Sequence, residues 1–277
     1  MGCALPVTAV FEVSGGSARA SSVGGAFTAV APDVGAVWYN AAVNARAQDL
    51  KVGTTHALLY PGLDGTLSLN ALSAAVPLGG GSAQVGLSTL DFSDWQEQIV
   101  AMGYGRPLHP RVAVGGTIRS SGWRTSGISH RSWSADVGAT YELGWLHYNT
   151  YVRLGAAVRN ITGANVSAGG YEAGETPRAF SVGAAVDVGN QGVLLDAERS
   201  GGFTTMRLGY ETRTASLGGS TFRLGVNNPL TSGSAGELDV GMGHTWNRWH
   251  IDYAYAYPLQ LTGLGGVHRL SLAYHKS

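Results

Sequence analysis

The sequence contains a single cysteine, Cys3, which excludes an internal disulfide and any cysteine-rich metal site. Lysine is almost as scarce, because only Lys51 and Lys276 occur in 277 residues. Charged residues make up 13% of the chain, against about 25% in an average protein. The 18 basic and 18 acidic residues cancel, so charge gives no reason to expect nucleic acid as a partner, and we exclude it.

Long hydrophobic runs are also missing. The longest uncharged stretch, residues 65–90, is rich in Ser and Thr and is interrupted by Pro77 and three consecutive glycines at 79–81. It therefore does not have the pattern of a membrane-spanning helix. If the protein lies in a membrane, it does not cross it with helices.

Glycine, in contrast, is abundant, with 42 residues. Disorder does not explain this abundance, because 44% of the chain is hydrophobic and it contains seven Trp and twelve Tyr, which is ample material for folding. We therefore expect glycines inside regular elements of the fold.

Most of the chain alternates apolar and polar residues with a period of two, which indicates β-strands. In residues 151–160, for example, Val152, Leu154, Ala156 and Val158 would face one side, with Arg153, Gly155 and Arg159 on the other. Fourteen such segments are predicted, at about 48–60, 63–76, 80–91, 95–105, 109–119, 131–143, 145–160, 178–188, 191–200, 202–211, 218–227, 235–246, 247–257 and 265–275.

An even number of strands of about ten residues is typical of an outer-membrane barrel. Short turns are predicted at 60–62, 144, 189–190 and 201–202, and longer extracellular loops at 120–130, 161–177 and 228–234. A soluble β-protein is the alternative, but its exposed face would normally carry many Lys and Glu. The sequence therefore predicts an all-β fold, an antiparallel transmembrane β-barrel of about 14 strands.

Charged residues in these strands are predicted to face the lumen, because an arginine facing lipid at the bilayer midplane costs about 2–4 kcal/mol. The motif Arg-Leu-Gly, at 153–155, 207–209 and 223–225, would place its Arg and Gly inside and its Leu in lipid. The predicted lumen-facing charges are Arg111, Asp136, Arg153, Arg159, Arg207, Glu211, Arg223, Asp239, Arg248, Asp252 and Arg269.

Three regions are expected along the chain: residues 1–9 as a signal-peptide remnant, 10–47 as an N-terminal segment, and 48–277 as the barrel. An ordinary flexible N-terminus is the alternative for the first nine residues. In the second region Asp33 could cap a short helix through Val37 and Trp38. From its residues alone, this region is either a plug inside the barrel or a linker.

Sequence runs in this region carry a resemblance. The stretches Ala-Arg-Ala at 18–20, Gly-Gly-Ala-Phe-Thr-Ala-Val-Ala at 24–31 and Trp-Tyr-Asn at 38–40 resemble the N-terminal signature of the PorV/PorQ family, relatives of the FadL fatty acid transporters. Strand segments such as VRLGAAVRN are similar as well. Members usually have Asn-Pro-Ala where this chain has Asn-Ala-Ala at 40–42, and the chain is short for the group.

The resemblance implies a fourteen-stranded barrel in the bacterial outer membrane, with residues 10–47 folded inside as a hatch. Its implied partners are outer-membrane lipids, other outer-membrane or secretion-system proteins, and a hydrophobic ligand. Three functions remain open: a role in protein secretion or surface assembly of the PorV/PorQ type, FadL-like transport of a hydrophobic small molecule, or a structural barrel. The first is the leading prediction.

These functions depend on different residues. Docking of a protein needs an exposed surface, for which the 122–130 loop with Trp123 is the candidate. Transport needs a pocket between hatch and wall. The hatch residues predicted for such a pocket are Phe27, Val30, Asp33, Val37, Trp38, Tyr39 and Asn40.

Enzyme chemistry is not expected, because the sequence lacks the common nucleophile, zinc and phosphate-binding motifs. His250 and Asp252 share an inner face at strand spacing and could orient a base, but an interior hydrogen bond is the simpler interpretation. We predict no enzymatic activity, no metal site and no cofactor.

Overall fold

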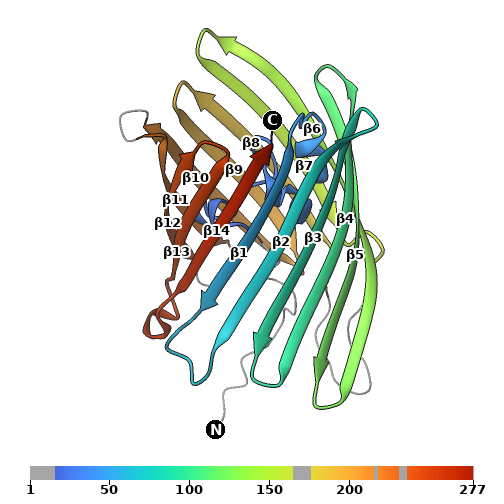
Figure 1. The fold of residues 1–277 in the computed structure, drawn as a ribbon, viewed down its shortest axis with the longest axis vertical. Helices are drawn as coiled ribbons and strands as arrows, with labels where there is room; N and C mark the ends of the chain where they lie inside the picture. The colour runs from blue at the N-terminus through green and yellow to red at the C-terminus, as the bar shows by residue number, and fades with distance from the viewer. Residues whose placement is uncertain (1–15, 165–175, 215–217, 231–235, 277) are drawn as a thin grey trace.

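The computed structural model describes residues 16–164, 176–214, 218–230 and 236–276. Within them, fourteen antiparallel strands close into a barrel (Figure 1). The strands are β1 (Leu50–Leu59), β2 (Leu67–Leu78), β3 (Gly81–Phe92), β4 (Trp95–His109), β5 (Val112–Thr125), β6 (Ile128–His147), β7 (Thr150–Arg159), β8 (Ala179–Val188), β9 (Gln191–Ser200), β10 (Phe203–Thr214), β11 (Ser220–Pro229), β12 (Glu237–Trp246), β13 (Trp249–Pro258) and β14 (Val267–Lys276). The predicted fold class is confirmed.

Each strand pairs with its neighbours in sequence, and β1 pairs with β14 from Leu50 opposite Lys276 to Leu59 opposite Val267. Closure leaves no strand edge without a partner strand, which a bilayer requires because it offers no water to unpaired backbone groups. Among the described residues, no helix is both long and apolar enough to cross a membrane.

The outer face of the barrel is apolar. Leu154 is 40% exposed and Leu208 is 47% exposed, as their alternation with Arg153 and Arg207 predicts. Large aromatic side chains lie toward both ends of this face, including Trp145, Trp246 and Trp249 at one end and Trp133, Phe180 and Tyr257 toward the other. An apolar band between aromatic belts is the surface of a barrel that spans a bilayer.

Connections between strands differ at the two ends. We call the end with the connections 79–80, 110–111, 148–149, 189–190, 215–219 and 247–248 the short-turn end. The long-loop end has the connections 60–66, 93–94, 126–127, 160–178, 201–202, 230–236 and 259–266. The predicted short turns at 60–62 and 201–202 thus lie at the long-loop end, and parts of the predicted loops 161–177 and 228–234 fall outside the described residues.

Two predicted connections are wrong. Residues 120–130 are not a long loop: β5 and β6 continue to a tight turn at Ser126 and Gly127, which both have positive φ and so suit the twist of a hairpin. Gly144 is not a turn but lies within β6, where the register shifts as in a β-bulge. The actual turn follows at 148–149.

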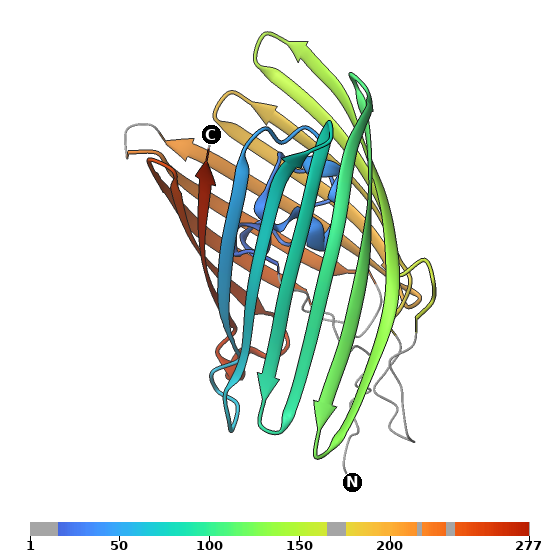
Figure 2. The same ribbon diagram turned by 45° about the vertical axis from the view of Figure 1, so that its right-hand side comes forward.

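The described N-terminal segment lies inside the barrel, nearer to its short-turn end (Figures 1 and 2). We call residues 16–47 the hatch. It forms three short helices: α1 (Ala18–Ser22), η1 (Val34–Trp38) and η2 (Ala41–Asn44). Their first N–H groups are capped by the side chains of Ser17, Asp33 and Asn40, which accept from the backbone nitrogens of residues 20, 35 and 42. A further short helix, η4 (Thr262–Leu264), precedes β14.

Glycines on the inner wall allow the hatch to approach closely. A β-carbon on Gly155 would lie 2.3 Å from the carbonyl oxygen of Thr28, and one on Gly225 would lie 2.1 Å from the nitrogen of Gly24. We call this set the glycine ring: Gly53, Gly86, Gly105, Gly115, Gly138, Gly155, Gly183, Gly209, Gly225 and Gly241. Several of its members are direct cross-strand partners, such as Gly105 with Gly115, and Gly209 with Gly225. Any larger residue there would meet the hatch.

Candidate functional site

Most predicted lumen-facing charges lie on the inner wall. They are Asp136, Arg153, Arg159, Arg207, Glu211, Arg223, Asp239, Asp252 and Arg269. The predicted lumen positions of Arg111 and Arg248 are wrong, because β5 begins at Val112 and β13 at Trp249. Both arginines are therefore exposed turn residues at the short-turn end, where Arg248 donates to the hydroxyl of Tyr274 at 3.4 Å.

Inner-wall side chains satisfy backbone groups of the hatch. The Asp196 carboxylate accepts from the nitrogens of Phe27 and Thr28 at 2.8 and 2.9 Å. Arg119 pairs with Asp136 and donates to the carbonyls of residues 37 and 38, each at 3.1 Å. Short helices and the segments between them leave many such groups without an internal partner, so these contacts anchor the hatch at residues 27–28 and 37–38.

Arg153 makes a similar contact with the hatch. It donates to the carbonyl of Ala29 at 3.3 Å and pairs with Asp187 at 2.5 Å. A second ionic group joins wall to wall, since Glu198 pairs with Arg159 and, at 3.0 Å, with Arg207. Asp196 and Glu198 both belong to β9. The alternating pattern of this strand could have placed them inside, yet they were not among the predicted lumen charges.

The predicted apolar pocket residues of the hatch are packed rather than open. Phe27 and Val30 lie in one core cluster with Leu194 of β9, and Val37 and Trp38 lie in another with Ile99 of β4. The Trp38 indole nitrogen also donates to the Ser73 hydroxyl at 2.9 Å. These side chains hold the hatch against the wall.

The two polar pocket candidates and Tyr39 also have partners within the hatch or the wall. Tyr39 lies 5.1 Å from Phe27, ring centre to ring centre, and burial raises the pKa of its hydroxyl. Asn40 donates to the carbonyls of Thr28 and Ala139 at 2.9 and 3.2 Å. Of the seven predicted pocket residues, Asp33 alone lines the cavity described next.

A cavity of about 520 Å³ lies between the hatch and the wall toward the short-turn end. Its volume is in the range of small-molecule sites. Its lining comes from the hatch and from strands that include β1 and β10 to β14. The lining residues are Ser17, Arg19, Ala31, Pro32, Asp33, Val34, Gly35, Gly53, Thr54, Thr55, Ser73, Asn190, Glu211, Arg213, Thr214, Gly219, Thr221, Arg223, Gly243, His244, Thr245, His250, Asp252, Ser271, Leu272, Ala273 and His275.

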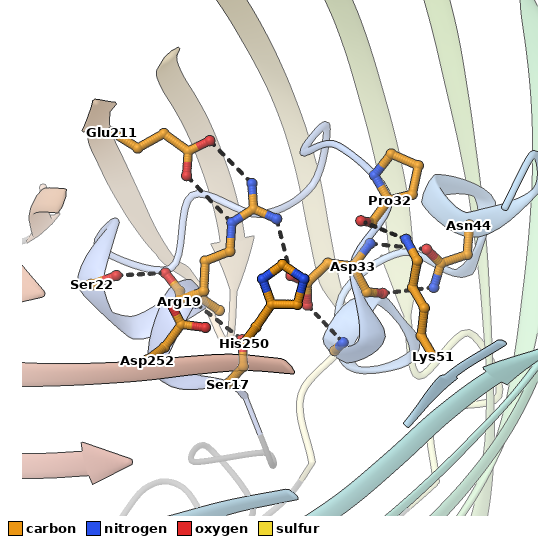
Figure 3. Close-up of polar contacts among 12 residues, drawn as sticks. Ser17, Arg19, Ser22, Pro32, Asp33, Asn44, Lys51, Glu211, His250 and Asp252 are labelled. Carbon is orange, nitrogen blue, oxygen red and sulfur yellow. Dashed lines mark hydrogen bonds and ion pairs between the residues drawn. The ribbon is translucent and has the colours of Figure 1, made fainter. Parts of the chain in front are cut away.

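An ionic network crosses this cavity from hatch to wall (Figure 3). Arg19 of α1 pairs with Asp33 at 3.0 Å and with Glu211 of β10 at 3.1 Å. Glu211 also accepts from Arg223 of β11 at 3.3 Å and from Arg213 at 2.7 Å. Although burial opposes its charge, the carboxylates of Glu211 and Asp33 hold the pKa of Arg19 above its ordinary value. Arg19 is central to this network, although the sequence pattern indicated no role for it beyond its place in the Ala-Arg-Ala run at 18–20.

The predicted His250 and Asp252 pair does not form a catalytic arrangement. Asp252 accepts from Arg223 at 2.6 Å, while His250 Nδ1 pairs with the Thr245 hydroxyl at 2.9 Å and its ring lies 4.2 Å from that of His275. Each side chain therefore has a partner other than the one its spacing suggested. No group of three or more His, Cys, Asp or Glu that could hold a metal occurs among the described residues.

The prediction that Trp123 is exposed in a loop is wrong. Trp123 lies within β5, is buried, and stacks on Trp95 of β4 with ring centres 5.1 Å apart and planes at 11°. Strand β5 continues past its predicted end at residue 119, so that this residue lies on the inner face of the strand. The sequence did not reveal this, because a tryptophan suits an exposed loop anchor and a buried stack equally well.

Comparison with known proteins identifies the architecture. No family model and no curated protein matches the chain. Among solved structures, the Ralstonia pickettii toluene transporter TbuX is similar with a TM-score of 0.67 and 11% identity over 96% of this chain and 99% of that one. The chain shares the barrel fold of this transporter.

Two further structures support this. The CymD monoaromatic hydrocarbon channel has a TM-score of 0.63 and 14% identity over 97% of this chain and 99% of its own. A Pseudomonas aeruginosa FadL homologue has a TM-score of 0.58 and 11% identity over 96% and 99%. At these identities the similarity establishes the fold alone, and it does not show the narrower PorV/PorQ resemblance.

Proposed function

We propose that the protein is a FadL-like channel that carries a small, largely hydrophobic molecule across the bacterial outer membrane. The observation that carries this proposal is the cavity of about 520 Å³ between hatch and wall, inside a barrel whose outer face is apolar. The full-length similarity to structures described as hydrocarbon channels and toluene transporters supports it. Lipids of the outer membrane would surround the barrel.

In this proposal the hatch controls passage. It contacts the glycine ring around the wall, so a molecule that crosses the barrel has to pass a hatch that has shifted or loosened. The cavity would be the last binding place on the short-turn side. That side would face the periplasm if the longer loops are extracellular, as the sequence predicts.

Protein secretion of the PorV/PorQ type and a purely structural role remain predictions. For the first, the candidate docking surface was the 122–130 segment, and its one large aromatic residue, Trp123, is buried in the barrel. Neither role requires a cavity beside the hatch. Transport therefore replaces secretion as the leading function.

Uptake by intact cells tests the proposal. Gram-negative cells that produce the protein should take up labelled toluene or benzyl alcohol faster than cells without it, because their outer membrane otherwise slows entry. Cells that produce an assembly-deficient variant, such as Leu154→Arg, are the control for expression. Equal uptake of both probes in all three strains would contradict a transport function.

A further inference from the structure

The cavity beside the hatch has a specific charge balance. Three arginines and three carboxylates line it: Arg19, Arg213, Arg223, Asp33, Glu211 and Asp252. Each of the six pairs with at least one other member of the set, at distances of 2.6 to 3.3 Å. With neutral histidines, the lining has no net charge and no arginine that lacks a carboxylate.

The cavity is also poor in large apolar groups. Among the described residues that line it, the only apolar side chains larger than alanine are Pro32, Val34 and Leu272. Leu272 belongs to the outward-facing set of β14, so only the two hatch residues remain as an apolar floor. The large aromatic residues of the hatch are packed elsewhere.

Hydroxyl groups supply much of the remaining wall. Thr55 and Ser271 share a hydrogen bond of 2.8 Å, and Thr245 pairs with His250. A hydroxyl has one donor and two acceptor positions, so each retains capacity for another partner. Lys51, just behind the lining, directs its ammonium to the carbonyl of Pro32 at 3.1 Å.

These features discriminate between ligand classes. A hydrocarbon would cover paired ions and hydroxyls and offer them no hydrogen bond in place of water. An anionic ligand would have to compete with carboxylates for arginines that are already paired, which leaves a buried charge without compensation. An uncharged ligand with hydrogen-bonding groups avoids both costs.

We propose that this cavity selects uncharged amphipathic molecules, with a small apolar body and a hydroxyl or amide group, over hydrocarbons and over carboxylates. The inference rests on the proposed transport function and names its substrate class. The apolar body would lie on Pro32 and Val34, and the polar group would contact the hydroxyls of Thr55, Thr245 or Ser271.

Three probes with one ring test this selectivity: toluene, benzyl alcohol and benzoate. Their binding to the purified full chain in nanodiscs is measured by calorimetry, with empty nanodiscs to subtract partition into lipid. We expect benzyl alcohol to bind at least about tenfold more tightly than benzoate and more tightly than toluene. Tighter binding of toluene or benzoate would overturn the inference.

A change of charge sharpens the test. Glu211→Gln removes the carboxylate that three arginines share and gives the lining a net positive charge. The affinity for benzoate should then rise about tenfold, while that for benzyl alcohol should change little. The matched control is Glu198→Gln, which makes the same change in an ionic group that does not line the cavity and should leave benzoate binding unchanged.

Asp252→Asn provides a second variant if Glu211→Gln fails to assemble, since it removes a carboxylate that pairs with a single arginine among the described residues, Arg223. Benzoate affinity that stays constant in every assembled cavity variant would contradict the charge-balance argument. Uptake of the same probes separates the two proposals. Preferred binding and uptake of toluene would overturn the selectivity but leave transport intact, whereas no binding and no uptake of any probe would overturn both.

Discussion

The barrel interior differs sharply between two levels that are only two residues apart on the same strands. At the glycine ring, Gly209 of β10 and Gly225 of β11 bring the wall against the hatch backbone. One inward position nearer the short-turn end, Glu211 pairs with both Arg19 and Arg223, and a cavity remains. Small residues thus seal the interior, while long paired charges hold it open.

The three residues of one Arg-Leu-Gly motif lie in three different environments. In Arg223-Leu224-Gly225 the arginine lines the cavity, the glycine contacts the hatch, and the leucine faces outward. The period of two in a strand makes this possible, because the first and third residues share the inner face. The following predictions test each of these surroundings in turn.

The outward position should give the largest effect. Leu154→Arg and Leu208→Arg each place a charge on the lipid face, at an expected cost of about 2–4 kcal/mol near the midplane. Assembly should fail, as judged by loss of heat-modifiable migration on gels. Leu154→Ala is the control that removes the side chain without adding charge, and normal migration of both arginine variants would show that the facing is misassigned.

A substitution in the glycine ring should have the second-largest effect. In Gly115→Leu the new side chain begins 2.5 Å from the nitrogen of Ala42, whereas in Gly116→Leu, one residue along on the outer face, the nearest atom is 3.6 Å away. Overpacking of this kind costs about 1–3 kcal/mol, so the first variant should loosen the hatch. Limited proteolysis of the hatch should be faster in Gly115→Leu and unchanged in Gly116→Leu. Equal protection in both would argue against a seal at the glycine ring.

A substitution at the mouth of the cavity should have the smallest effect on stability. Arg213 is 50% exposed although its partner Glu211 is buried, so Arg213→Gln should lower the free energy of unfolding by about 1 kcal/mol or less. Arg223→Gln is the matched comparison, because this arginine is buried and bridges two carboxylates. Denaturant unfolding in detergent should show a clearly larger loss for Arg223→Gln. Similar losses would mean that the buried and the exposed arginine contribute equally to the free energy of unfolding.

The fold could be predicted from the sequence because a barrel repeats one signal many times. Alternation identified fourteen strands, and the cost of charge in lipid assigned Arg153, Arg207 and Arg223 to the inside. The glycines were expected inside regular elements, and the structure gives the reason in their contacts with the hatch.

The site was less predictable, because the hatch has no periodic pattern. Phe27 and Trp38 were expected along a pocket, since apolar residues suit a ligand site and a packed core equally. Arg19 stood in a run of small residues with nothing to indicate its partners, which lie 14 and 192 positions away. Contacts over such separations depend on how the hatch folds back inside the barrel.

If molecules pass this barrel only when the hatch moves, a reversible lock between hatch and wall should stop their passage. The β-carbon of Ala41 in η2 lies 3.4 Å from the position of a β-carbon on Gly103 of β4, close to the spacing of a disulfide. We would measure benzyl alcohol uptake by cells that produce Ala41→Cys/Gly103→Cys with Cys3→Ser, before and after reduction. We expect slow uptake when the disulfide is formed and recovery when it is reduced; equally fast uptake in both states would show that passage does not require movement of the hatch.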